Sequence, residues 1–226
     1  DIERVSGRRQ RETCLHRSRH DAVSVLRSPL AMQVLHGQRV VAVGDGTNPI
    51  AYSSDGITWT GASNNPFSGN VGQDIAWNGT RWVVVGSGTN TIAYSSDGIT
   101  WTGAANSPFS NNNGRGIAWN GTRWVAVGWG TNTIAYSSDG ITWTGAGNHQ
   151  YSDKIGQDIA WNGTRWVAVG SGNSTIAYSS DGITWTVSNN LFSSNVGLGI
   201  ASAPAPLLVP AQKGINQNKN DGDIFR

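Results

Sequence analysis

Glutamate, cysteine and methionine are scarce in this chain of 226 residues. The only glutamates are Glu3 and Glu12, and both lie near the amino terminus. Because glutamate is a strong helix former, its scarcity disfavours a helical protein and favours an all-β fold. Cys14 is the only cysteine, so a disulfide within the chain is excluded and cysteine content indicates no compartment.

Long apolar runs are also lacking. No segment approaches the roughly 20 apolar residues that a membrane-spanning helix needs, so we expect no membrane span. Residues 1–27 contain no apolar stretch of the signal-peptide kind, and the chain does not begin with methionine. Localisation therefore stays open, and an extracellular or surface location is slightly favoured.

Positive charge is not concentrated in the central part of the chain. Residues 34–201 carry six basic and eight acidic side chains. A nucleic-acid surface requires clustered lysine and arginine, so we expect no nucleic-acid partner. Cys14, His16 and His20 have a spacing that faintly resembles a metal site, but they supply only three ligands within an arginine-rich segment. The sequence predicts neither a metal nor a cofactor.

What the sequence does contain is a tandem repeat. The segment Ala76–Trp82 recurs without a slipped residue at 118–124 and 160–166, which is a period of 42 residues. A second block, Ile50–Thr60, recurs in the same phase at 92–102, 134–144 and 176–186. Four units are complete and a fifth begins at Gly199. A period of this size indicates a repeat architecture.

Each unit is predicted to form four short strands. In the second unit these are residues 75–77, 81–85, 92–95 and 99–102, chosen for their apolar alternation or apolar runs. The pair Asn78–Gly79 is expected to occupy the centre of a type I′ hairpin turn, and residues 96–98 form the third turn. The result is an antiparallel meander of four strands.

One such sheet has two apolar faces, so successive sheets must stack. Radial stacking of four-stranded antiparallel sheets is a β-propeller, and we predict this fold with four complete repeats plus a partial fifth. Residues 31–201 are the propeller, residues 1–30 an arginine-rich tail expected to be disordered, and residues 202–226 a Pro/Ala linker with a polar tail. Two alternatives stay open: the four blades close with the help of residues 196–201, which is slightly favoured, or further blades are needed.

The motif Ser-Ser-Asp-Gly-Ile-Thr-Trp occurs at 53–59, 95–101, 137–143 and 179–185. It resembles a shortened form of the Asp-box, or BNR, repeat of sialidases and other propellers. The resemblance covers residues 34–201 and implies a propeller fold, with similarity to the sialidase-like superfamily in fold only. It also implies a structural role for the residues of the box, which are Asp55, Trp59, Asp97, Trp101, Asp139, Trp143, Asp181 and Trp185.

Catalytic residues are not predicted. Glycosidases generally use two carboxyl groups, or in sialidase-type enzymes a tyrosine activated by a glutamate. Residues 34–201 contain no glutamate, and the repeats hardly differ, whereas an active site needs unlike groups in unlike roles. The sequence therefore favours a protein that is not an enzyme.

Variation between the repeats is confined to one edge of the predicted sheets. The first and third turns are nearly constant, whereas the second turns and the connections between units vary in aromatic and polar residues. Loops on a rigid scaffold commonly bind ligands, and exposed aromatics beside polar groups are typical of sugar binding. The alternative is that these loops vary only because they tolerate substitution, without any role in binding. The candidate ligand-binding residues are Asp45, Phe67, Asp74, Phe109, Arg115, Trp129, Tyr151 and Asp158.

Three hypotheses for function follow. The favoured one is a non-enzymatic binding or interaction scaffold, with multivalent, lectin-like carbohydrate binding at the variable edge. The second is a sialidase- or glycosidase-like enzyme, and the third is a structural or assembly protein of a microbial or viral particle. The partners expected are glycans or another protein, and the oligomeric state is not predicted.

Overall fold

The computed structural model describes residues 39–67, 71–106, 108–109, 113–130, 132–146, 156–172, 175–188, 192 and 196–203. All regular elements within these ranges are β-strands. The described part of the chain has no helix of the length and hydropathy that crossing a bilayer requires. The predicted tail over residues 1–30 and nearly all of the predicted segment 202–226 lie outside the described residues.

The strands form antiparallel sheets of three, eight and four strands, and the eight-stranded sheet is divided here at its single β5–β8 residue pair, which gives four successive units that we name sheets A to D. Sheet A contains β1 (Val40–Val43), β2 (Ile50–Ser53) and β3 (Thr60–Gly61). Sheet B contains β4 (Val71–Trp77), β5 (Trp82–Ser87), β6 (Ile92–Ser95) and β7 (Thr102–Gly103). Sheet C contains β8 (Asn113–Trp119), β9 (Trp124–Trp129), β10 (Ile134–Ser137) and β11 (Thr144–Gly145). Sheet D contains β12 (Gly156–Trp161), β13 (Trp166–Gly170), β14 (Ile176–Ser179) and β15 (Thr186–Val187).

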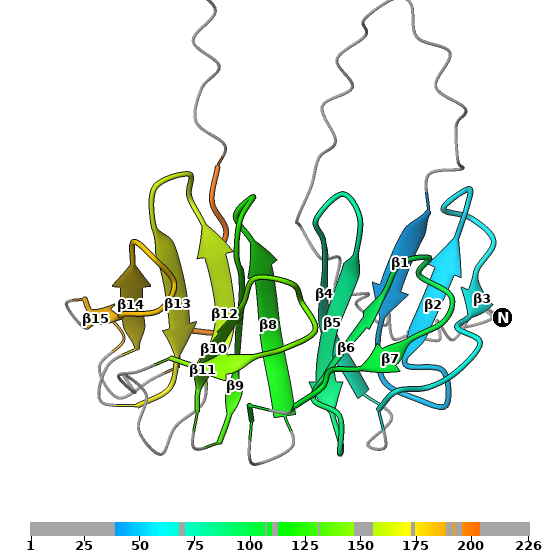
Figure 1. Ribbon diagram of the computed structural model, residues 1–226, viewed down its shortest axis with the longest axis horizontal. Helices are drawn as coiled ribbons and strands as arrows, with labels where there is room; N and C mark the ends of the chain where they lie inside the picture. The colour runs from blue at the N-terminus through cyan, green and yellow to red at the C-terminus, as the bar shows by residue number, and fades with distance from the viewer. Residues whose placement is uncertain are drawn as a thin grey trace, which may run out of the picture.

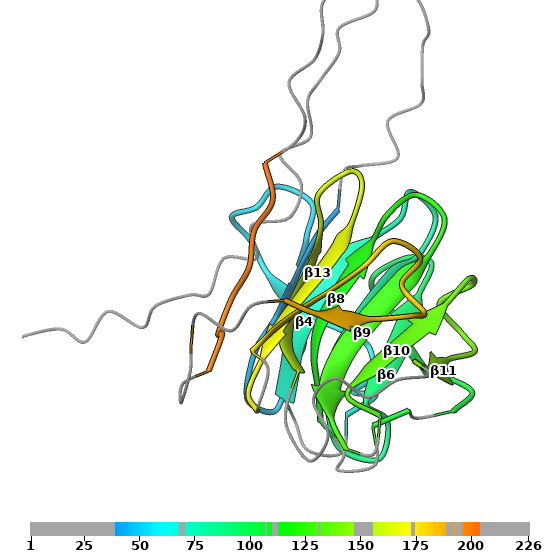
Figure 2. The same ribbon diagram turned by 90° about the vertical axis from the view of Figure 1, so that its left-hand side faces the viewer.

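The sheets follow one another along an open arc. In Figure 1 sheet A lies at one end and sheet D at the other, and Figure 2 shows the arc from the side of sheet D. The long strands β4, β8 and β12 are neighbours, and Ser87 at the end of β5 pairs with Asn113 at the start of β8. This arrangement of repeated antiparallel sheets is the predicted all-β propeller.

The hydrophobic core lies between sheets, as the stacking argument requires. Trp101 of sheet B is buried with Val41 and Ile50 of sheet A. The equivalent tryptophans repeat this arrangement: Trp143 packs with Val83 and Val85, and Trp185 packs with Val125 and Val127. Burying an indole contributes at most about 5 kcal/mol before the cost of ordering the chain is subtracted. Each boundary between sheets is therefore a small core of its own.

The first turn of the second, third and fourth units differs by one residue from the prediction. Trp77 pairs with Trp82, and the Asn78 N–H donates to the Arg81 carbonyl at 3.1 Å, so Gly79 and Thr80 are the central residues of the turn. The Asn78 side chain accepts from the N–H groups of Thr80 and Arg81 instead of standing at the centre. The positive φ of 100° at Gly79 explains why glycine is needed there.

The fourth strand of each unit is shorter than predicted. The sequence alternation predicts a strand over residues 99–102, whereas β7 contains only Thr102 and Gly103. The reason is local: the Asp97 carboxylate accepts from the N–H groups of Ile99 and Thr100, and this curls both residues into the preceding turn.

Candidate functional site

The four Ser-Ser-Asp-Gly turns have one hydrogen-bond pattern. In the first, the Ser53 hydroxyl donates to Asp55 Oδ1 at 2.8 Å and accepts from the Gly56 N–H at 2.8 Å. Asp55 Oδ1 also accepts from the N–H groups of Ile57 and Thr58, both at 2.8 Å. The same bonds recur around Asp97, Asp139 and Asp181. One oxygen of each of these carboxylates, Oδ1, is therefore engaged by its own turn.

The surroundings of the turn carboxylates favour their charged form. Donation from the Ile57 and Thr58 N–H groups holds the pKa of Asp55 well below its usual range. For Asp97 partial burial raises the pKa, but donation from Thr100, Ile99 and Ser95 together with the charge of Arg39 lowers it more. The net pKa is lowered at Asp139 and Asp181 as well. Such groups stabilise structure and are poor proton donors at neutral pH.

The turns around Asp97 and Asp139 are also held by an arginine from the preceding sheet. Arg39 donates through Nη1 to the Asp97 carbonyl, and Arg81 donates to the Asp139 carbonyl. The same guanidinium groups lie over tyrosine rings of their own sheets, with Arg81 Cζ 5.2 Å from the Tyr94 centroid. Arg39, Arg123 and Arg165 stack in the same way on Tyr52, Tyr136 and Tyr178. Arg39 and Arg81 therefore connect neighbouring sheets.

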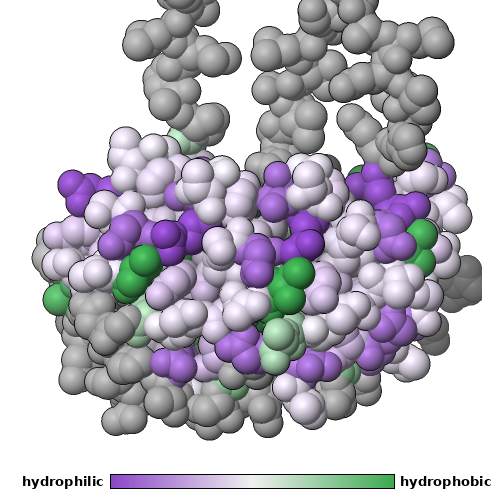
Figure 3. Space-filling view, viewed as in Figure 1, coloured by the Kyte–Doolittle hydropathy of each residue, from purple (hydrophilic) through white to green (hydrophobic). Residues whose placement is uncertain are grey.

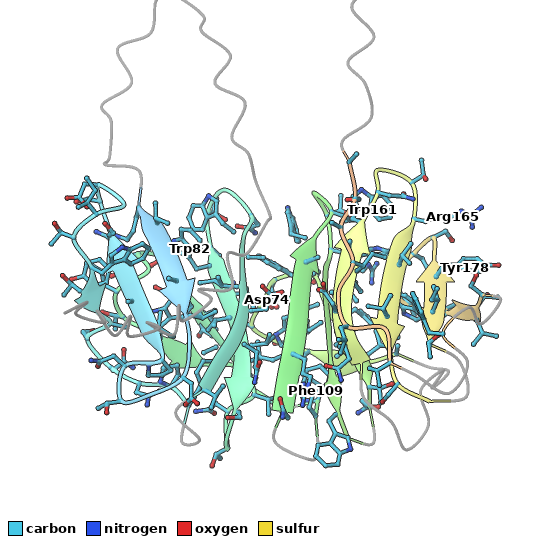
Figure 4. The ribbon with its side chains drawn as sticks, turned by 180° about the vertical axis from the view of Figure 1, so that it is seen from behind. Asp74, Trp82, Phe109, Trp161, Arg165 and Tyr178 are labelled. Carbon is cyan, nitrogen blue, oxygen red and sulfur yellow. The ribbon has the colours of Figure 1, made fainter. Side chains whose placement is uncertain are left out.

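Asp74 and Asp158 lie on the long strands β4 and β12, at bulges, and not in the variable loops where the sequence placed them. Asp74 Oδ2 accepts from the Ile117 N–H of β8 at 2.9 Å, and Oδ1 accepts from the Ile75 N–H. Figure 4 shows Asp74 between sheets, in the middle of the arc. Asp158 repeats the pattern with Ile200 and Ile159. Both carboxylates therefore join one long strand to the next.

The electrostatic environment of Asp74 is opposite to that of the turn carboxylates. Burial raises the pKa of Asp74 from 3.8 to about 7, with donation from Ile117 and Ile75 opposing this rise and the charge of Asp158 adding to it. In sheet C the equivalent position is Gly116, and a Cβ there would stand 3.3 Å from Asp158 Oδ1. The alternation of aspartate and glycine in the sequence therefore reflects close packing of the long strands.

A polar cluster lies around β8 and includes two residues that the sequence had not indicated. Arg115 Nη1 donates to Gln157 Oε1 of β12 at 3.0 Å. Asn113 pairs across the sheet with Trp129, whose side chain is 41% exposed. Arg115 Nε and Asn113 Oδ1 are buried and have no hydrogen-bond partner among the described residues. Asn113 and Gln157 occupy variable positions of the repeat, which is the signal that could have identified them.

Two of the candidate aromatics are not available to a ligand. Phe67 and Phe109 are 0% and 1% exposed, because they lie against Gly86 and Gly128, where the missing side chains leave room for a ring. Both side chains were predicted to be exposed and to stack on sugars, and the prediction that they are exposed is wrong. Asp45 is exposed, and Trp129 remains the exposed aromatic among the candidates that the structure describes. Tyr151 lies outside the described residues.

Two hollows are present on the described surface. One, of about 160 Å³, is lined by residues of sheet A that include Asn48, Ser63 and Asn65. The other, of about 270 Å³, lies at the far end of the arc between sheet D and residues 200–203. The face of the molecule drawn in Figure 3 is mostly hydrophilic, with apolar side chains in small separate patches. Among the described residues no three His, Cys, Asp or Glu side chains come together as metal ligands do.

Comparisons with known proteins support the architecture. Neither a scan against models of protein families nor a search of the curated proteins gives a match. Among solved structures, a chain in the crystal structure of a nidogen/laminin complex is 15% identical with a TM-score of 0.57, over 75% of this chain and 66% of that one. The GH74 enzyme of Niastella koreensis is 22% identical with a TM-score of 0.50, over 67% of this chain and 22% of that one.

At these identities the likeness concerns the fold alone. The chain spans less than two thirds of either neighbour, at 66% and 22% of their lengths. Both neighbours are β-propeller proteins, and the stacked antiparallel sheets described above belong to the same class. The protein is a repeat β-propeller.

Proposed function

We propose that the protein is a non-enzymatic binding scaffold that takes carbohydrate, in the manner of a lectin, at the edge carrying Trp129. The observation that carries this proposal is the 41% exposure of the Trp129 side chain at a position where the other repeats have Asp45, Ser87 and Ser171. An indole face in water beside hydrogen-bonding groups suits a sugar ring, which has apolar C–H faces and polar edges.

The neighbours of Trp129 support the same ligand class. Asn113 lies directly across the sheet, and the Arg115–Gln157 hydrogen bond connects this part of sheet C to sheet D. Asp45 extends the polar edge on sheet A.

A glycan array tests the proposal. We expect the wild-type chain to bind a subset of glycans, and Trp129→Ala to reduce that binding about tenfold or more, since stacking on an aromatic ring contributes about 1 kcal/mol beyond area burial. Ser87→Ala, at the same position of the preceding repeat, is the matched control and should bind as the wild type does. Absence of binding by a chain with a native circular dichroism spectrum would falsify the proposal.

A glycosidase is the second candidate, favoured by one observation. Burial raises the pKa of Asp74 to about 7, so this carboxyl group is partly protonated at neutral pH, as a general acid must be. The hydrogen bonds that Asp74 and Asp158 accept from backbone N–H groups speak against it, because they occupy the carboxylates. Turnover of a fluorogenic glycoside that is lost in Asp74→Asn, with the fold retained, would favour this candidate over the first.

A further inference from the structure

The two ends of the described arc are unlike its internal boundaries. At the end formed by sheet A, Trp59 is 43% exposed, whereas the equivalent Trp101, Trp143 and Trp185 are 3%, 2% and 1% exposed. Ile57 beside it is 84% exposed. We call Gly56, Ile57 and Trp59 together with strand β1 the head surface. It carries the tryptophan that sheets B to D bury against their predecessors, and an isoleucine that is half-buried in those sheets.

The opposite end carries the complementary groups. Arg165 and Tyr178 lie together there, at the end of the arc formed by sheet D, as Figure 4 shows. The hollow of about 270 Å³ lies beside them and is lined by Ala160, Val167 and Ile200, among others. Arg165 stacks on Tyr178, and its guanidinium donates to no described residue. We call Arg165, Val167 and residues 196–203 the tail surface.

Three internal boundaries show how a head surface fits a tail surface. A Cβ on Gly98 would stand 2.9 Å from Val41 and 3.2 Å from Arg39 Cδ of the preceding sheet. Gly140 faces Val83 and Arg81 in the same way, and Gly182 faces Val125 and Arg123. A Cβ on Gly56, by contrast, would have no other atom within 4 Å. On the tail surface the equivalents of the facing residues are Val167 and Arg165, which face the hollow and the solvent.

Charge contributes to this fit. Arg39 donates to the carbonyl of Asp97, and its positive charge is one cause of the lowered pKa of that carboxyl group. Asp55 presents the same carbonyl and the same carboxylate on the head surface, without an arginine nearby among the described residues. Arg165 on the tail surface is a cation in the matching position, so the two surfaces are complementary in charge as well as in shape.

The strand edges of the two ends match as well. Sheets B to D each begin with a long strand, whereas sheet A, as far as it is described from residue 39 on, has three strands and β1 at its edge. Residues 196–203 lie along β12, with the Ile200 N–H donating to Asp158 and the Ser202 hydroxyl to the Trp161 carbonyl. Ile117 makes the equivalent bond to Asp74. The segment 196–203 thus has the position that a long strand takes beside the preceding one.

We propose that the head surface of one copy of this chain binds the tail surface of a second copy, with residues 196–203 completing sheet A of the neighbouring copy. By analogy with the Ile75–Val84 and Ala76–Val83 pairs, Ile200 lies opposite Ala42 of the second copy and Ala201 opposite Val41. The boundary formed in this way continues the three internal boundaries of the arc. Two copies related by a twofold axis use both surfaces of each chain and form a closed dimer.

Sedimentation velocity of the full chain over a range of concentrations tests the proposal. We expect the wild-type chain to have twice the mass of one chain. Ile57→Glu blocks the head surface and Arg165→Glu blocks the tail surface, so each variant alone should have the mass of one chain. Both residues are exposed, so circular dichroism should report an unchanged fold. Ser138→Glu adds the same charge at an exposed position of sheet C and should leave the dimer intact.

Mixing the two variants distinguishes head-to-tail binding from any other contact. The Ile57→Glu chain retains its tail surface and the Arg165→Glu chain its head surface, so an equimolar mixture should recover a dimer through one intact boundary. A wild-type chain that stays monomeric at every concentration overturns the proposal. So does a dimer that survives either variant, or a mixture of the two variants that contains only monomers.

Discussion

At the scale of single residues, the aspartates of the repeat have two opposite environments. Asp55, Asp97, Asp139 and Asp181 accept N–H donors within exposed turns, and their pKa values are lowered. Asp74 lies between sheets, and burial raises its pKa to about 7. The same side chain therefore favours ionisation at one position of the repeat and protonation at the other, and the two groups affect stability in different pH ranges.

We expect the wild-type chain to be more stable near pH 5 than near pH 8. The folded pKa of Asp74 is about 7 against 3.8 for an ordinary aspartate, so the folded state holds a proton that the unfolded state releases between these values. Stability therefore falls as the pH rises through this interval. In Asp74→Asn the difference in stability between pH 5 and pH 8 should be much smaller. Urea unfolding midpoints at both pH values measure it.

The turn aspartates supply the control for this experiment. Their folded pKa values are lowered, so their stabilisation is complete above the unfolded value near 4 and is lost only as the pH falls further. Asp139→Asn should therefore lower the stability at both pH 5 and pH 8 without changing the difference in stability between the two pH values. An Asp74→Asn chain that keeps the full wild-type difference would contradict the assignment to Asp74.

Residue roles were the least predictable part of the structure. Trp129 is exposed as the sequence suggested, but Phe67 and Phe109 are buried. An aromatic in a connecting segment has the same sequence signature whether it faces solvent or fills a space, and that space depends on Gly86 and Gly128, about 20 residues further on in the chain. Only the three-dimensional packing distinguishes the two cases.

At the scale of strands and turns, the predictions were good where the signal is local periodicity. The strand predicted at 92–95 has those bounds in the structure, and the strand predicted at 81–85 is β5, Trp82–Ser87. The strand predicted at 99–102 is largely wrong, since the Asp97 side chain competes for the N–H groups that a strand would use. Side-chain hydrogen bonds of this kind do not appear in apolar alternation.

Glycines at the end of the second strand of each unit provide a test at this scale. A Cβ on Gly86 would run into the Val71 carbonyl and stand 3.0 Å from the Phe67 ring. We expect Gly86→Ala to lower the free energy of unfolding by about 3 kcal/mol, the range seen for overpacked cores. Gly44 has the same repeat position, but a Cβ there would have no other atom within 4 Å, so Gly44→Ala should be nearly neutral. Equal losses in the two variants, measured by urea unfolding, would contradict the packing described here.

At the scale of the whole molecule, the repeat predicted the architecture. Two apolar faces per sheet required stacking, and the tryptophans Trp101, Trp143 and Trp185 are buried between sheets. The open ends could not be predicted, because the sequence of the first unit contains at Trp59 the same tryptophan that the other units bury. Their exposure depends on which neighbour is present, and that is a property of the assembly.

Self-association through the two ends makes thermal stability depend on concentration. A dimer that dissociates on unfolding gains stability as the protein concentration rises, so the wild-type Tm should increase across a dilution series. Ile57→Glu removes the head surface, and its Tm should be the same at every concentration. Differential scanning fluorimetry measures both chains, and a constant wild-type Tm would argue against association.

The recurrence of the Arg–Tyr stack and its carbonyl partner at successive boundaries bears on how the length of such a protein can change. Duplication or loss of two adjacent 42-residue segments would create no new kind of boundary, since both the Arg–Tyr stack and the alternation of aspartate and glycine at positions 74, 116 and 158 would be kept. Changes in length are therefore expected to be tolerated in such pairs of segments, whereas a deletion that is not a multiple of 42 residues would place a tryptophan where a turn belongs.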